Sequence, residues 1–84
     1  MIVSYDPLVG ATYVELLVER AVARTVSVSD LVMVDLDANG EPVGVEFAVF
    51  PGQITAQMLD RVAERFPTLK ELRYSEHWLL TAAR

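Results

Sequence analysis

The chain contains no cysteine and only one histidine among its 84 residues. The missing cysteines exclude a disulfide scaffold, a thiolate zinc site, a cysteine nucleophile and a dithiol redox role. His77 would need metal ligands from elsewhere in the chain, and no second histidine or cysteine exists to supply them. No segment reaches the roughly 18 uninterrupted apolar residues of a membrane span, so no membrane role is expected.

Basic residues are also scarce, with 7 Lys and Arg against 12 Asp and Glu and a formal net charge of -5. None lies between Arg24 and Arg61, whereas five lie from Arg61 onward. Binding to DNA or RNA through bulk charge needs clustered cations, so we expect no nucleic-acid partner. The uneven charge favours either a cationic partner or complementary self-association, with a merely solvated acidic face as the alternative.

The apolar content is high for so short a chain. Hydrophobic residues make up 52% and the mean hydropathy is +0.31. We expect a single domain over residues 1–84, with a β-rich part at 1–50 and a helical region and tail at 53–84. A domain of this size buries only about two-thirds of its unfolded surface, so some apolar material should be buried against a second copy, as a homodimer. The N-terminus lacks the basic start and apolar core of a signal peptide, which predicts a cytoplasmic protein.

Glycine and proline divide the first part of the chain into short runs rich in Val, Leu and Thr, which favour strands. The predicted strands are residues 1–5, 12–18, 21–28, 31–37 and 43–50. Short connections favour an antiparallel meander in which each strand pairs with the next along the chain. Between the last two strands, Asp37-Ala38-Asn39-Gly40 predicts a hairpin turn with Gly40 at positive φ.

The hydrophobic period then changes to that of a helix. Thr55 is a plausible N-cap, and Leu59, Val62, Ala63 and Phe66 share one helical face. Pro67 ends this helix, and residues beyond it predict a short second helix or a strand. The predicted fold is therefore α+β, a five-stranded antiparallel β-meander with one packed C-terminal helix.

One helix is narrower than a five-stranded sheet, so several apolar side chains remain to be covered. We expect these residues to form the homodimer interface, since a Trp in a terminal segment is a common interface anchor. They are Phe50, Leu72, Trp78, Leu79 and Leu80.

The sharpest motif match is a calcium-loop pattern, D-x-[DN]-x-[DN]-G-x5-E. Its residues are Asp35, Asp37, Asn39, Gly40 and Glu46. Calcium loops join two helices, whereas the flanks here predict strands. A hairpin turn explains the same residues, because turns favour Asp, Asn and Gly. We expect no metal or cofactor and no enzymatic activity, since the Asp35–Asp37 pair is predicted to lie on an exposed turn where nothing would raise a pKa.

Several of these motifs together resemble the small bacterial DUF2283 family, over residues 1 to about 50. Its members typically read Tyr-Asp-Pro, an acidic pair, Ala-x-Tyr-Ile and later Val-Asp-x-Asp-x-x-Gly-x-x-x-Gly-Ile-Glu. The matching segments here are Tyr5-Asp6-Pro7, Ala11 with Tyr13, Thr25-Val26, residues 34–40 and residues 43–46. The chain departs from this pattern at Leu8-Val9-Gly10, where the family usually places acids.

The resemblance implies a fold and no catalytic residues, since the family's function is uncharacterised. Such genes also occur beside small toxin-like genes, which implies an antitoxin-like role as an alternative. A glycine inside a strand, as at Gly44, suggests that a neighbouring aromatic ring or backbone approaches closely there. Our leading expectation is a non-catalytic protein-interaction module that self-associates, and the second is a partner of a small basic toxin.

Overall fold

The computed structural model describes residues 2–16 and 18–74. Five strands come first, and helical segments follow them. The strands are β1 Ile2–Asp6, β2 Ala11–Glu15, β3 Arg24–Ser29, β4 Val32–Leu36 and β5 Pro42–Phe47. The helical segments are η1 Pro51–Gln53, α1 Ala56–Arg65, η2 Pro67–Leu69 and α2 Glu71–Tyr74.

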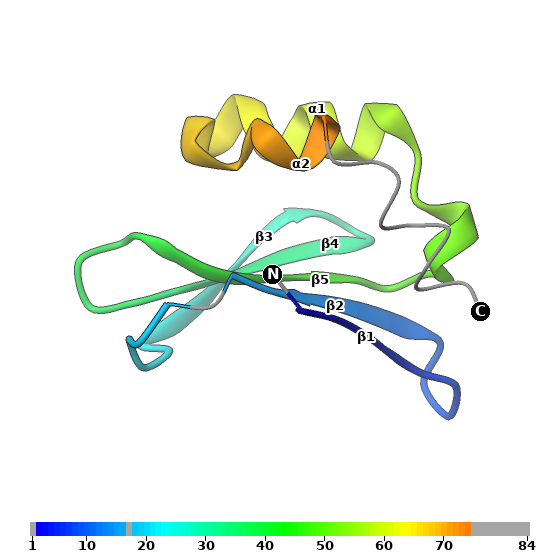
Figure 1. The fold of residues 1–84 in the computed structure, drawn as a ribbon, viewed down its shortest axis with the longest axis horizontal. Helices are drawn as coiled ribbons and strands as arrows, with labels where there is room; N and C mark the ends of the chain where they lie inside the picture. The colour runs from blue at the N-terminus through cyan, green and yellow to red at the C-terminus, as the bar shows by residue number, and fades with distance from the viewer. Residues whose placement is uncertain (1, 17, 75–84) are drawn as a thin grey trace.

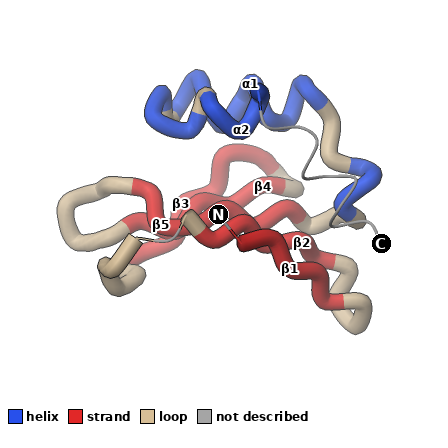
Figure 2. Tube along the Cα trace, in the orientation of Figure 1, coloured by secondary structure: helices blue, strands red, loops and turns tan. Residues whose placement is uncertain are grey.

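The strands form one antiparallel sheet in the order β1-β2-β5-β4-β3. Helices α1 and α2 lie together over one face of this sheet, so the domain has two layers (Figures 1 and 2). No described element covers the opposite face, which we call the outer face. The α+β class and the five antiparallel strands with one packed helix are confirmed.

The order of the strands differs from the predicted meander, because β2 pairs with β5 and not with β3. In β5, which has a neighbouring strand on each side, every residue except Glu46 is buried. The residues between β2 and β3 do not form a tight hairpin. They carry the chain past β5 and β4 to the far edge of the sheet, where β3 pairs with β4.

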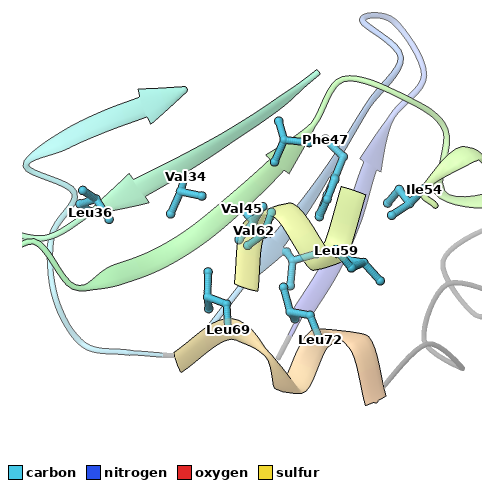
Figure 3. Packing of buried hydrophobic residues seen from close by; sticks show 11 residues of the cluster. Val34, Leu36, Val45, Phe47, Ile54, Leu59, Val62, Leu69 and Leu72 are labelled. Atoms are coloured by element: carbon cyan, nitrogen blue, oxygen red, sulfur yellow. The ribbon is translucent and has the colours of Figure 1, made fainter. Parts of the chain in front are cut away.

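The hydrophobic core fills the space between the sheet and α1 (Figure 3). Val34 and Val45 face each other across β4 and β5 and are fully buried, as is Val62 of α1. Alternation then places residues 32, 34 and 36 toward the helix and residues 33 and 35 on the outer face. One face of the β4–β5 hairpin is therefore buried and apolar, while the other carries Asp35 and Glu46.

Helix α1 begins and ends close to where the sequence predicts. The Thr55 hydroxyl accepts a hydrogen bond from the Met58 N–H at 3.2 Å, which is the predicted N-cap. Phe66 is the C-cap, and Pro67 opens the short helix η2. The predicted second helix is present as α2 after η2. The question of a helix or strand at residues 75–84 lies outside the described residues.

No helix in the described part of the chain is long and apolar enough to cross a membrane.

Candidate functional site

Side chains of the outer face form a polar row that runs across four neighbouring strands, from β2 over β5 to β4 and β3. Tyr13 of β2 donates its hydroxyl to Asp35 Oδ2 at 2.7 Å, and the Thr25 hydroxyl of β3 donates to Asp35 Oδ1 at 2.5 Å. Thr25 and Asp35 are directly opposite in the β3–β4 pair, and Asp35 is opposite Gly44 in the β4–β5 pair. Both carboxylate oxygens of Asp35 are therefore engaged by hydroxyl groups.

Gly44 makes this row possible. Tyr13 is opposite Glu46 in the β2–β5 pair, so its ring reaches Asp35 only by crossing diagonally over Gly44. A Cβ atom placed on Gly44 would lie 1.8 Å from the Tyr13 hydroxyl oxygen and 2.4 Å from its Cζ. The expected close approach of an aromatic ring to Gly44 is confirmed.

The environment of Tyr13 keeps its hydroxyl protonated. Burial is the largest cause that raises the pKa of Tyr13 above its ordinary value of 10.0, followed by the hydrogen bond to Asp35 and the charge of that carboxylate. The negative charges of Glu15 and Glu46 act in the same direction. The neutral hydroxyl donates its hydrogen bond to Asp35, so this row links β2 to β4 across β5.

The hairpin between β4 and β5 has the predicted turn, with Gly40 at φ +81° and its N–H donating to the Asp37 carbonyl at 3.1 Å. The Asp37 carboxylate accepts from the backbone N–H groups of Asn39 and Glu41 at 2.8 and 2.9 Å. Its second oxygen lies 2.7 Å from Arg20 Nε, its one partner among the described residues.

Asp37 departs from the sequence prediction, because its residue is 3% exposed where an exposed turn was expected. The backbone of the turn binds one oxygen of the Asp37 carboxylate, and the Arg20 side chain pairs with the other. The N–H of Glu41 is the largest influence on its carboxyl and lowers the pKa below the ordinary value of 3.8. Burial opposes this change, while the N–H of Asn39 and the charge of Arg20 reinforce it.

The five residues of the calcium-loop pattern do not converge on one point. The carboxylate of Asp35 binds hydroxyl groups on the outer face, while that of Asp37 binds the backbone of the turn. Within residues 2–16 and 18–74, no group of three His, Asp or Glu side chains is arranged to hold a metal ion. These residues lie in the β4–β5 hairpin, as the flanking strands predict.

The rest of the outer face is acidic. Strand pairing and alternation place a set of β1–β5 side chains on this face. They are Ile2, Ser4, Asp6, Ala11, Tyr13, Glu15, Thr25, Ser27, Met33, Asp35, Gly44 and Glu46. Four of them are acids and none is a base, so these strands present a negative surface.

The predicted interface residues have different places in the structure. Phe50 is 53% exposed and stacks on Tyr5, with ring centroids 5.1 Å apart. Leu72 is 4% exposed and belongs to the core beneath the helices (Figure 3), so the chain itself encloses this side chain. Trp78, Leu79 and Leu80 lie outside the described residues.

Sequence reasoning missed the partners of the two aspartates. It placed Asp35 on an exposed turn and expected a close neighbour at Gly44, but it did not connect Tyr13 and Thr25 with them. The alternation of side chains along β2 and β3 could have placed Tyr13 and Thr25 on the outer face. Only the pairing of β2 with β5 brings Tyr13 near Asp35. Arg20 lies in an irregular connection, where no periodicity indicates a partner.

The fold and the outer face together define a two-layer α+β domain in which hydrogen-bonded polar side chains hold strands together. The DUF2283 family, described as a protein of unknown function, matches residues 2–48, which is more than half of the chain. The protein therefore belongs to the DUF2283 family. The matched segment holds the whole five-stranded sheet, including Tyr13, Asp35 and Gly44, and leaves out α1 and α2. Neither the curated proteins nor the solved structures contain a significant match to the chain.

Proposed function

We propose that this protein is a non-catalytic interaction module that works in the cytoplasm and associates with a second copy of itself. The observation that carries the proposal is the apolar surface left outside a core that is already closed. Among the residues that the structure describes, seven large hydrophobic side chains are exposed outside the core. They are Ile2, Leu8, Val9, Val22, Leu31, Met33 and Phe50.

The placement of polar groups supports a non-catalytic role. Asp35, Asp37 and Tyr13 are the side chains best positioned for chemistry, and each is already engaged by partners within the fold. A general base or nucleophile needs a proton or a lone pair available to a substrate. The hollow between β3 and α1, about 310 Å³ in volume, is lined by Val28, Arg61, Glu64 and Arg65, a set without a nucleophile.

Sedimentation equilibrium across low to high micromolar concentrations tests the proposal. The expected mass is twice the 9.3 kDa of one chain, and it should persist at high salt because apolar burial is little screened. A mass of 9.3 kDa at high micromolar concentration would contradict self-association. The tail residues Trp78 and Leu80 remain predicted interface residues, and polar substitutions there should shift the equilibrium toward the monomer.

A second candidate function is binding of a basic protein, in the manner of an antitoxin and its toxin. The acidic outer face favours this alternative, because none of the strand side chains placed on that face is basic. The test is co-purification from the native host at low and high salt, using the wild type and a Glu15→Lys/Glu46→Lys variant. A basic protein retained by the wild type at low salt and lost with the variant would support it. Equal retention by both would count against it.

A further inference from the structure

We propose that the second copy docks along the outer edge of β1, so that two sheets join into one antiparallel sheet across a two-fold axis at Ser4. This inference rests on the proposed self-association and assigns it a surface. Edge strands present unpaired N–H and C=O groups and are ready sites for pairing with another chain.

The hydrogen-bond ladder shows which groups of β1 point outward. The Leu16 N–H donates to the Val43 carbonyl at 3.1 Å, which sets the alternation along β2. Ser4 of β1 then bonds to β2, in register with Tyr13. Its neighbours Val3 and Tyr5 therefore direct their backbone N–H and C=O groups away from the sheet, where β1 has no neighbouring strand among the described residues.

At the opposite edge of the sheet, the protein itself engages an outward-pointing carbonyl group of β3. The Ala48 N–H donates to the Leu31 carbonyl at 2.8 Å, so by the same alternation the backbone of Ser27 in β3 points outward. Arg65 of α1 donates from Nη1 to that Ser27 carbonyl at 2.8 Å. The register also shifts between Ser27 and Ser29, an irregularity that bends an edge away from pairing. Of the two edges, β1 is the one that can accept a strand.

The register of the pairing follows from symmetry. A two-fold interface brings the same strand against itself, and pairing over all five residues of β1 requires the axis to pass at the central residue, Ser4. Val3 then lies opposite the partner's Tyr5, and Tyr5 opposite the partner's Val3. Each of these pairs exchanges two backbone hydrogen bonds, using every outward group of the two residues. Ser4 faces the partner's Ser4 without hydrogen bonds, at about 4.5 Å between Cα atoms.

The side chains around this axis suit a second copy better than a basic partner. Val3, Ser4 and Tyr5 carry no charge, although the chain has a net charge of -5. On the helix side, the ring of Tyr5 stacks on the half-exposed Phe50, and both would adjoin the partner's Val3. On the outer face, Ile2 is 53% exposed and would lie opposite the partner's Asp6. Pairing would thus bury exposed apolar surface without bringing acids together at the axis.

A charge swap at the axis tests this arrangement. Ser4 is exposed on the outer face, so Ser4→Lys and Ser4→Asp should each leave the folded chain intact. In either homodimer, two like charges would face each other directly, which destabilises a cross-strand pair. We expect the dimer Kd to rise at least tenfold in each variant, equivalent to 1.4 kcal/mol. An equimolar mixture of the two should recover the wild-type affinity as a heterodimer, because the facing charges are then opposite.

Ser27→Lys and Ser27→Asp are matched controls, since Ser27 is an exposed serine on the same face of the other edge strand. Their Kd should equal that of the wild type. If the wild type is a dimer and all four variants keep its Kd, the proposed docking along β1 is wrong and the proposed self-association still holds. A monomeric wild type would overturn both proposals.

Backbone amide exchange gives a second readout, because the Val3 and Tyr5 amides should be protected only at concentrations where the dimer forms. Protection in the monomer would mean that the same chain covers this edge, and would also overturn the inference.

Discussion

The Tyr13 ring lies across Gly44 so closely that a Cβ atom there would be 1.8 Å from the Tyr13 hydroxyl oxygen. The two residues belong to neighbouring strands, and the ring uses the missing side chain to reach Asp35 on the strand beyond. A tyrosine and a glycine thus act as one unit that joins β2 to β4 across β5.

Substitution of Gly44 by alanine should therefore destabilise the fold. The new methyl group would displace the Tyr13 ring and break its hydrogen bond to Asp35, at a cost of about 1 to 3 kcal/mol in the free energy of unfolding. Urea denaturation measures this cost. The same substitution in a Tyr13→Ala background should cost much less, because the clash is gone. Equal costs in the two backgrounds would show that the ring does not occupy this position.

Alkaline pH should weaken the fold through Tyr13. The native state holds this proton more tightly than the unfolded chain does, because the pKa of Tyr13 is raised above 10.0 in the fold. Its stabilisation is complete below the unfolded pKa and is lost as the pH rises toward the native pKa. Thermal unfolding from pH 8 to pH 12 should show a fall in midpoint above about pH 10. Tyr13→Phe should show a smaller fall, and an identical slope in both proteins would contradict the assignment.

Acid pH should weaken the fold through Asp37. The pKa of its carboxyl is lowered below 3.8 in the native state, so the unfolded chain binds the proton more readily. Its stabilisation is present above the unfolded pKa and is lost as the pH falls through the lower native value. Asp37→Asn should lower the melting temperature at neutral pH and flatten the decline below about pH 4. The exposed Asp30→Asn serves as the control and should keep the wild-type acid profile.

Calcium should leave the melting temperature unchanged, because Asp35 and Asp37 direct their carboxylates to different partners. A site with a Kd of about 10 μM would add about 2.7 kcal/mol at 1 mM calcium, a change that a melting curve resolves easily. A clear rise with calcium, abolished by Glu46→Gln, would restore the metal-loop interpretation.

Local patterns in the sequence were enough to locate most elements. The Val- and Leu-rich run at residues 31–37 predicted β4, and the hairpin turn followed from the sequence Asp37-Ala38-Asn39-Gly40. Thr55 and Pro67 bounded α1 correctly. Each of these features depends on residues close together along the chain, so short-range preferences decide it.

The burial of Asp37 and the partners of Asp35 were beyond such reasoning. Arg20, which pairs with Asp37, lies in the connection between β2 and β3, where the sequence has no hydrophobic period. Thr25 contacts Asp35 because the register of the β3–β4 pair places the two residues opposite each other. The same limit applies to Leu72, which was expected at an interface and is enclosed by the chain's own core. An apolar stripe on a helix indicates that its side chains will be buried, but it does not indicate whether the core of the same chain or a second copy buries them.

The sequence by itself determined the α+β class, the five strands, the helix and the need for a small residue at Gly44. These follow from local periodicity, turn chemistry and steric limits that act over a few residues. Tertiary structure alone decided the strand order, and with it the diagonal reach of Tyr13 to Asp35 and the exposure of β1 as an edge. Short connections favour pairing with the next strand, which is a local preference. The observed order instead places β5 between β2 and β4, where five of its six residues are buried, and burial of apolar surface is a property of the whole fold.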